Sequence, residues 1–173
     1  LQSLAYSMDL PESGIYEELD LVAISIGADL VELKGENRIM ASQGMRQLRT
    51  RQRPGILALM RAADIHQAPQ TIRDISFTLG PRINAAGRMD HAQRVVDLLM
   101  EKSDVRASEM AREIEEMNHQ RREVDEMTTA EALMKLEKTP EEPFCNIVYG
   151  TDWHRGVVGI VASRIIEHRY RPS

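Results

Sequence analysis

The sequence is poor in cysteine and in aromatic residues. It contains one cysteine among 173 residues, and Phe, Trp and Tyr together make up only 4%. A single cysteine excludes an internal disulfide and provides no partner for a zinc site, so we expect Cys145 to be a small core residue on a strand. Because aromatic side chains are scarce, the core must consist mainly of Leu, Ile, Val, Met and Ala, a mixture usual in helix-rich α/β proteins.

Long hydrophobic runs are also absent. No segment approaches the ~18 consecutive apolar residues of a membrane span, and no charged-then-apolar leader opens the chain. With 42% hydrophobic and 28% charged residues, the composition is that of a soluble globular protein. We therefore expect a cytoplasmic protein with no membrane partner.

An excess of positive charge is lacking as well. The chain carries 22 Lys and Arg against 27 Asp and Glu, a formal net charge of −5. This balance argues against indiscriminate coating of nucleic acid, because that affinity comes mainly from Lys and Arg displacing counterions from phosphates. Basic residues nevertheless cluster in RQLRTRQR, residues 46–53. This segment either lines a path for a nucleic-acid backbone or forms a solvated helix end.

The pattern of apolar residues predicts an α/β protein. The run DLVAISIGA, residues 20–28, is rich in Val and Ile and predicts a buried strand, and CNIVY, residues 145–149, predicts a second one. Five further segments predict helices: residues 36–51, 56–64, 92–100, 105–138 and 157–169. The segment GPRINAAGRMDH, residues 80–91, shows neither a helical nor a strand pattern.

An acidic residue follows the first predicted strand. Asp29 comes directly after the run at residues 20–28. In open α/β sheets ligands gather at the carboxyl ends of strands, and a carboxylate oxygen suits Mg²⁺ or Mn²⁺. The alternative is that Asp29 merely caps the next turn or helix. One carboxylate is not a metal site.

The segment at residues 80–91 combines arginines with small residues. Its glycines and alanines let a ligand approach the main chain, while Arg82 and Arg88 offer bidentate donors for phosphate or carboxylate oxygens and Asn84 a neutral donor. These residues predict an anion cradle. The alternative is a glycine-bounded turn whose arginines pair with local acids such as Asp74 or Asp90.

A third candidate lies in DWHRGVVGIVASR, residues 152–164. The free amides and positive dipole at the start of the predicted helix favour anions, and a histidine there can donate to phosphate, ligate a metal or shuttle a proton. The alternative is a structural histidine next to Trp153. The candidate residues are His154, Gly156, Gly159, Ser163 and Arg164.

At GPRINAAGRMDH and DWHRGVVGIVASR the sequence resembles the RecJ single-stranded-DNA exonucleases, a family of the DHH phosphoesterase superfamily. The resemblance implies that Asp29, in ADLVEL, is the last metal-binding aspartate of a centre with two Mn²⁺ or Mg²⁺ ions. It implies substrate-phosphate contacts for Arg82, Asn84 and Arg88, and nucleotide contacts for His154, Ser163 and Arg164. The implied reaction is 5′→3′ hydrolysis of single-stranded DNA in repair and recombination. Single-stranded DNA with a 5′ end would be the partner, with single-strand-binding protein or a helicase as further candidates.

The resemblance also implies a division of the chain. Residues 1–34 would be the C-terminal tail of a DHH-type catalytic domain, residues 35–66 a connecting helical region, and residues 67–173 most of a smaller DHHA1-like α/β domain. The Asp-His-His triplet and the Gly-Gly-His motif of the family are absent, and Glu32 stands at a usual proline. We therefore expect a piece of a longer exonuclease that is inactive by itself.

Two other functions remain open. The protein can be another phosphoesterase of the superfamily that acts on oligoribonucleotides, cyclic dinucleotides or pyrophosphate. It can also be a non-catalytic scaffold in a replication complex.

Overall fold

A computed structural model of the chain describes residues 2–9, 11, 13–50, 53–138 and 144–173. Within these ranges the regular structure is helical and contains no strand. The helices are α1 (Gln2–Ser7), α2 (Ser13–Tyr16), α3 (Leu19–Ala28), α4 (Gly35–Thr50), α5 (Pro54–Ala62), α6 (Ile72–Phe77), α7 (Leu79–Met89), α8 (Gln93–Met100), α9 (Asp104–Lys138) and α10 (Val158–His168). None of these described helices is long and apolar enough to cross a membrane.

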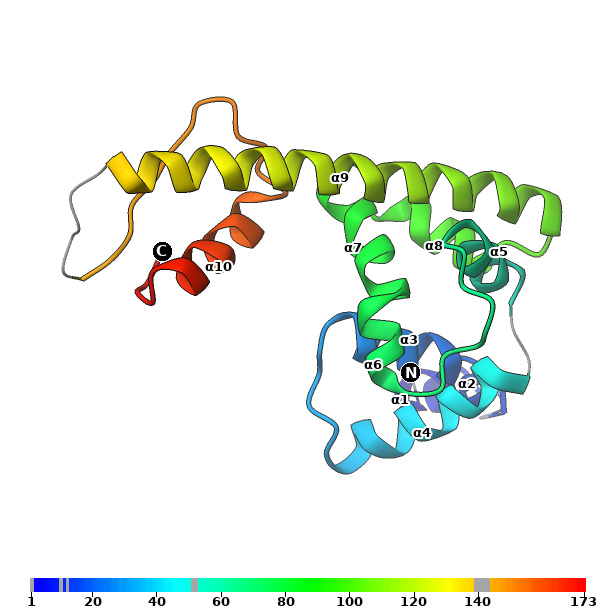
Figure 1. The fold of residues 1–173 in the computed structure, drawn as a ribbon. Helices are drawn as coiled ribbons and strands as arrows, with labels where there is room; N and C mark the ends of the chain where they lie inside the picture. Colours follow the sequence, from blue (N-terminus) through cyan, green and yellow to red (C-terminus); the bar gives the residue numbers. More distant parts are fainter. Residues whose placement is uncertain (1, 10, 12, 51–52, 139–143) are drawn as a thin grey trace.

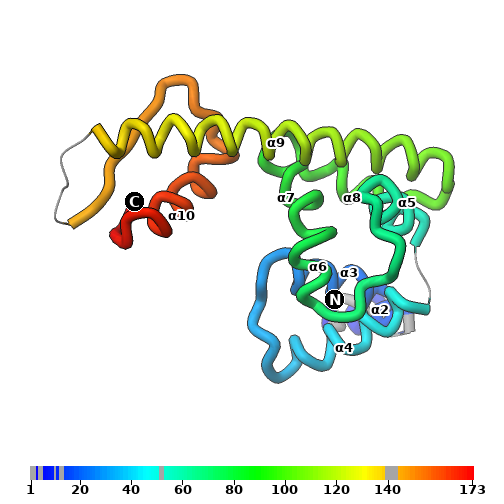
Figure 2. The backbone as a smooth tube through the Cα atoms, viewed as in Figure 1, coloured from blue at the N-terminus to red at the C-terminus, as the bar shows by residue number. Residues whose placement is uncertain are grey.

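The 35-residue helix α9 organises the molecule. Figure 1 shows α5, α7 and α8 packed along its N-terminal half and α10 beneath its C-terminal half. Helix α7 leads away from α9 towards α3 and α6, and α4 packs against α3. The backbone trace in Figure 2 shows the segment between α9 and α10 passing over α9 before α10 runs beneath it. Helix α9 therefore joins two groups of elements.

Each group has its own hydrophobic core. The larger core lies between α3, α4, α5, α6, α7, α8 and the N-terminal half of α9. The smaller core lies where α10 meets the C-terminal half of α9 and consists of Ala132, Leu136, Val157, Val161 and Ile165. The larger core takes residues from all three parts of the predicted division of the chain, whose boundaries stay a prediction.

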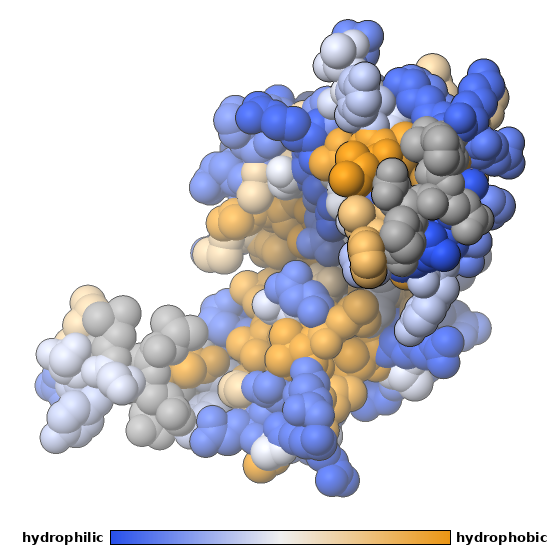
Figure 3. Space-filling view, turned by 90° about the vertical axis from the view of Figure 1, so that its left-hand side faces the viewer, coloured by the Kyte–Doolittle hydropathy of each residue, from blue (hydrophilic) through white to orange (hydrophobic). Residues whose placement is uncertain are grey.

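Large apolar side chains remain exposed in several parts of the described chain, two of which lie at helix junctions. Leu30, Leu33 and Ile39 are exposed around the end of α3 and the start of α4, and Phe144 and Ile147 are exposed between α9 and α10. Figure 3 shows apolar surface gathered on one face of the molecule.

The five helices predicted from apolar spacing are confirmed as α4, α5, α8, α9 and α10, with ends at most two residues from the predicted ones; the predicted end at residue 51 lies outside the described residues. The strand predicted at residues 20–28 is wrong, because this segment forms α3. Ala23, Ile24, Ile26 and Gly27 are all buried, so α3 has apolar neighbours on several sides. A helix buried on several sides loses its 3.6-residue pattern and cannot be distinguished from a buried strand by periodicity.

The second predicted strand, at residues 145–149, is not a strand in the described structure. The segment is irregular, and the backbone N–H of Asn146 donates to the carbonyl oxygen of Pro172 over 2.7 Å. Cys145 is half-buried, which differs from the expected core position on a strand. The α/β class predicted for this chain is therefore unconfirmed, since its described residues form no strand.

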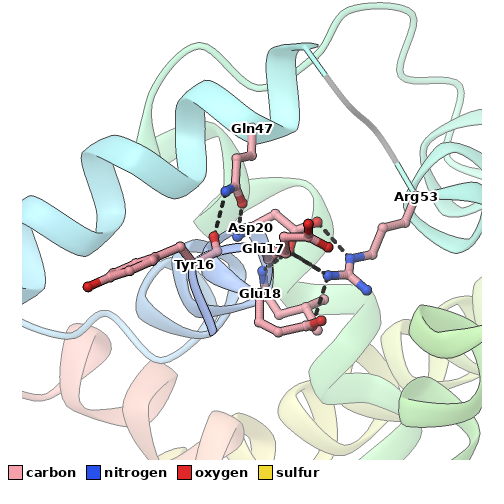
Figure 4. A network of polar contacts seen from close by, with 7 residues as sticks. Tyr16, Glu17, Glu18, Asp20, Gln47 and Arg53 are labelled. Atoms are coloured by element: carbon pink, nitrogen blue, oxygen red, sulfur yellow. Dashed lines mark hydrogen bonds and ion pairs between the residues drawn. The ribbon is translucent and has the colours of Figure 1, made fainter. Parts of the chain in front are cut away.

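The end of the basic segment at residues 46–53 forms an internal network (Figure 4). Nε of Arg53 donates to Oδ2 of Asp20 over 2.7 Å, and Nη2 of Arg53 donates to Oε2 of Glu18 over 2.8 Å. The hydrogen bond to Asp20 raises the pKa of Arg53. Gln47 accepts from the backbone N–H of Asp20 and donates to the carbonyl of Tyr16. Arg53, the N-cap residue of α5, thus ties α5 to the start of α3 and does not form a solvated helix end.

A capping box begins α6. The hydroxyl of Thr71 accepts from the N–H of Asp74, and the carboxylate of Asp74 accepts from the N–H groups of Thr71 and Gln70. The N–H of Thr71, followed by that of Gln70, lowers the pKa of Asp74 below its ordinary value of 3.8.

This box predicts a pH-dependent contribution to stability. Replacing Asp74 by alanine should lower the free energy of unfolding by about 1 kcal/mol near neutral pH. Because the pKa of Asp74 is depressed in the folded state, its stabilisation is present above pH 3.8 and is lost as the pH falls through the folded-state pKa. Urea unfolding of both proteins at neutral pH and below the folded-state pKa of Asp74 checks this. A difference in the free energy of unfolding between the two proteins that is as large in acid as at neutral pH would contradict it.

Candidate nucleic-acid interface

The segment GPRINAAGRMDH is helical over most of its length, as α7, and not the irregular turn that its composition suggested. Leu79, Ala85 and Ala86 are buried on its inner side. Gly80 lets α7 approach α3 closely, since a Cβ at this position would lie 3.1 Å from the Cα of Ala28. The small residues therefore serve helix packing, and the three candidate polar residues project from a rigid helix.

Arg82 is directed into the protein. It is 8% exposed, and its guanidinium pairs with the carboxylate of Glu115 on α9 and donates to the carbonyl of Thr78 over 2.7 Å. Its acidic partner is neither Asp74 nor Asp90. An arginine that is held in this way stabilises the contact between α7 and α9, and its role as a phosphate contact stays a prediction.

Asp29 and Asn84 line the same groove. Asp29 is the exposed C-cap residue of α3, and Asn84 donates from Nδ2 to the carbonyl oxygen of Ala28, the preceding residue, over 3.3 Å. The groove, of about 310 Å³, is lined by Leu21, Ile24, Ser25, Ala28, Asp29, Ile83, Asn84, Gly87, Ala92, Val95, Val96 and Leu99. The structure thus brings together residues from two predicted motifs, and Asn84 holds the backbone next to Asp29.

A complete metal centre is not present among the residues that the structure describes. No group of three or more His, Cys, Asp or Glu in these ranges is arranged to hold a metal ion. Asp29 can supply one carboxylate oxygen, a ligand that Mg²⁺ and Mn²⁺ accept. The described residues alone do not fit a two-metal site.

Arg88 joins α7 to the loop before α10. Its Nη1 donates to the carbonyl oxygen of Gly156 over 3.2 Å, and the N–H of Gly156 donates to Nδ1 of His154 over 3.1 Å. A Cβ on Gly156 would overlap the carbonyl oxygen of Arg88, so only glycine allows this approach. Arg88 and His154 are exposed. The structure therefore brings together one residue from each predicted phosphate motif.

The remaining candidates lie on α10. Ser163 donates to the carbonyl of Gly159 over 3.1 Å, and a Cβ on Gly159 would meet open space. Arg164 donates from Nη2 to Oδ2 of Asp125 on α9 over 2.8 Å. Asp125 is only 1% exposed, whereas 42% of the Arg164 side chain is accessible. Arg164 is thus anchored at one end of its guanidinium and open to solvent elsewhere.

Arg121 lies close enough to three other arginines to feel their charge, and two of the four contact Asp125. We call Arg88, Arg121, Arg122 and Arg164 the arginine cluster. Burial lowers the pKa of Arg121, Asp125 opposes this effect, and the positive charges of Arg122, Arg88 and Arg164 add to it. No carboxylate in the described ranges forms an ion pair with Arg88. Like charges held together around a single buried carboxylate favour an additional anion at their exposed side.

The segment NHQRREVDE, residues 118–126, is almost entirely polar, which by itself favours an exposed helix face, with anchoring of a neighbouring domain by Arg121 and Arg122 as the alternative. A signal was present, because Asn118, Asp125 and Thr129 fall at helical spacing from apolar Ile114 and are all buried. Polar residues on the buried stripe of a helix need partners and therefore mark a contact with polar groups of another element. For Asp125 this group is Arg164 of α10, whereas Asn118 and Thr129 are hydrogen-bonded to residues of α9 itself.

The chain is similar to curated RecJ proteins over most of its length. It is 41% identical over 168 residues to the single-stranded-DNA-specific exonuclease RecJ of Dickeya dadantii, and 42% identical over 161 residues to that of Escherichia coli. These alignments cover 94% and 90% of the chain but only 29% and 28% of the relatives. The chain thus spans less than a third of the length of these relatives. No model of a known protein family matches the chain.

Solved structures give the same result. The crystal structure of RecJ from Thermus thermophilus in complex with Mg²⁺ superimposes with a TM-score of 0.83 at 28% identity, covering 97% of the chain and 26% of that structure. A crystal structure of exonuclease RecJ bound to manganese gives a TM-score of 0.80 at 28% identity, covering 97% of the chain and 42% of that structure. The sequence identity over at least nine tenths of the chain and the shared fold together show that this chain belongs to the RecJ family, and it corresponds to one segment of these relatives.

Proposed function

We propose that the whole protein to which this segment belongs hydrolyses single-stranded DNA from its 5′ end, with two divalent ions, Mn²⁺ or Mg²⁺, in DNA repair and recombination. Its relatives are named single-stranded-DNA-specific exonucleases, and related crystal structures contain Mg²⁺ or Mn²⁺. We place the protein in the cytoplasm, with single-strand-binding protein or a helicase as candidate partners.

The arginine cluster is the observation that carries this proposal. Arg121 from α9 and Arg164 from α10 contact the buried carboxylate of Asp125, while Arg88 on α7 is exposed and 42% of the Arg164 side chain is accessible. Guanidinium groups match the oxygens of phosphate and bind them through charge-assisted hydrogen bonds. We assign the cluster, with His154 beside it, to the 5′-terminal phosphate or the adjacent backbone of the DNA.

Helix α7 would set the distance between this clamp and the reacting bond. Asn84 holds the backbone next to Asp29, and Arg88 lies four residues later, one helical turn or ~6 Å along the axis. Both residues lie on one face of a rigid helix. Fixed spacing between a terminal phosphate and the reacting centre favours removal of the terminal nucleotide, because correct positioning is a major source of rate enhancement.

Binding of short single-stranded oligonucleotides tests the clamp. The chain should bind a 5′-phosphorylated oligonucleotide more tightly than its 5′-hydroxyl counterpart, as measured by fluorescence anisotropy. Replacing Arg88 by alanine should reduce affinity for the phosphorylated form about tenfold, the value of one charge-assisted contact. It should also reduce the slope of affinity against salt by about one. Arg112→Ala, an exposed arginine on α9, is the matched control and should leave the preference unchanged.

A nuclease assay distinguishes the activity expected of this segment from that proposed for the whole protein. The 173-residue chain is expected to digest no single-stranded DNA with Mn²⁺ or Mg²⁺, since Asp29 is the one metal ligand that we assign to it. Digestion by this chain would show that it holds a complete site. Absence of any 5′-phosphate preference in the folded chain would refute the clamp.

A further inference from the structure

A row of buried polar residues follows one side of α9. We call Glu115, Asn118 and Asp125 the polar row. Asn118 is 0% exposed and Asp125 1% exposed, and 27% of the Glu115 side chain is accessible. Burial of such groups is costly unless each one finds hydrogen-bond partners. No buried side-chain nitrogen or oxygen in the described residues lacks a partner, so the row is satisfied.

The N-terminal part of the row connects two arginines. Glu115 pairs with Arg82 from α7 and also accepts from Nδ2 of Asn118 over 3.3 Å. The Oδ1 atom of Asn118 in turn accepts from Nη2 of Arg121 over 3.0 Å. Asn118 therefore uses both ends of its amide, and this orientation directs Arg121 along α9 towards Asp125.

The C-terminal part of the row completes the arrangement. Oδ2 of Asp125 accepts from Nη2 of Arg164 over 2.8 Å and lies 3.8 Å from Nη1 of Arg121. Its Oδ1 accepts from the hydroxyl of Thr129 over 3.4 Å. One carboxylate thus holds guanidinium groups from two helices side by side. Only 13% of the Arg121 side chain is accessible, so its conformation is fixed by these contacts.

We propose that Asn118 and Asp125 are positioning residues that orient Arg121 and Arg164 for a terminal phosphate. This inference rests on the proposed function of the arginine cluster and deepens it. An arginine has several rotatable bonds, and ordering it at the moment of binding costs free energy that a preorganised side chain does not lose. The contacts of Asn118 and Asp125 order these arginines when the chain folds, so binding of the phosphate does not have to order them.

A role of Asp125 through its charge alone predicts a different effect of its neutralisation on binding than a positioning role does. If Asp125 only competed with the phosphate for the arginines, its neutralisation would strengthen binding of every polyanion, because the site gains one unit of positive charge. If Asp125 positions the arginines, its neutralisation weakens recognition of the terminal phosphate specifically. An asparagine at this position would also direct an N–H group where the carboxylate now accepts from guanidinium donors.

The test compares affinities for 5′-phosphorylated and 5′-hydroxyl oligonucleotides in the full 173-residue chain. In Asp125→Asn the preference for the 5′-phosphate should fall about fivefold, while affinity for the 5′-hydroxyl form stays equal or rises. Asn118→Ala removes the acceptor for Arg121 without changing any charge, and its preference should fall in the same direction. Glu126→Gln, an exposed acid on the same helix, is the control for charge and should leave the preference unchanged.

Each outcome has one meaning when helicity by circular dichroism is recorded alongside. An unchanged preference in Asn118→Ala overturns the inference, as does tighter binding of both oligonucleotides by Asp125→Asn with the same preference. A proportional loss of affinity for both oligonucleotides also overturns it, because that result indicates a merely structural role. If Asp125→Asn does not fold, the 5′-phosphate preference of Asn118→Ala decides whether the inference holds. Absence of any preference in the unmodified chain refutes the proposed function instead.

Discussion

Replacing Arg82 by alanine is expected to lower the free energy of unfolding by about 3 kcal/mol, the lower end of the range for breaking a buried ion pair. Arg82 is 8% exposed and pairs with Glu115, which would lose its ion-pair partner while only 27% of its side chain reaches solvent. The substitution also removes the hydrogen bond to the carbonyl of Thr78. Urea unfolding monitored by circular dichroism measures the change.

The matched control is the other arginine of the same helix. Arg88→Ala should change the free energy of unfolding by no more than about 0.5 kcal/mol, since Arg88 is exposed and donates to a single carbonyl. The two substitutions thus distinguish a role in folding from a role in binding. Arg82→Ala should lower the free energy of unfolding, and Arg88→Ala should lower the affinity for phosphate. Equal losses of stability would contradict this. A stable Arg82→Ala protein with weakened phosphate binding would place Arg82 in the clamp.

Replacing Gly44 by alanine is expected to lower the free energy of unfolding by about 3 kcal/mol or more. A Cβ at this position of α4 would overlap the carbonyl oxygen of Leu19 and crowd the Cβ of Ala23, both on α3. Because the first obstacle is backbone, no side-chain rotation relieves it, and the two helices must separate. The better helix propensity of alanine, about 1 kcal/mol, offsets only part of this loss.

Gly87 provides the control for Gly44. It also lies within a helix, but a Cβ there would lie 3.7 Å from the Cβ of Ala92, an ordinary contact. Gly87→Ala should therefore be neutral or stabilising by up to about 1 kcal/mol. Thermal and urea unfolding of both variants measure the difference. A tolerated Gly44→Ala would mean that α3 and α4 pack less closely than described.

Two of the helices that sequence analysis missed, α3 and α7, have a common physical cause. Apolar spacing predicts a helix when one face is buried and the other is solvated, as in α4, α9 and α10. Helix α3 is buried on several sides, and its run of Val and Ile suggested a strand. Helix α7 carries two glycines and a proline, which suggested a turn. Both of these helices fold in contact with each other and with α6, so tertiary packing determined their conformation.

The candidate site was only partly predictable for a similar reason. Arg88, His154 and Arg164 were predicted as site residues because their motifs are unusual, and the structure places all three near the contacts between α7, α9 and α10. Arg121 and Asp125 were read as part of a solvated face. Their role depends on which arginines reach α9 from other helices, and local sequence carries no information about such distant partners.

The sequence by itself determined the amphipathic helices, the absence of an internal disulfide and the two motifs that relate the chain to its family, because these depend on neighbouring residues or on residue identity alone. The tertiary structure decided which of the two arginines of α7 is buried and which is exposed. It also decided that Asn84 contacts the backbone next to Asp29, and that Asp125 holds Arg164. These contacts join residues that are 33 to 68 positions apart, so they arise only when the helices pack.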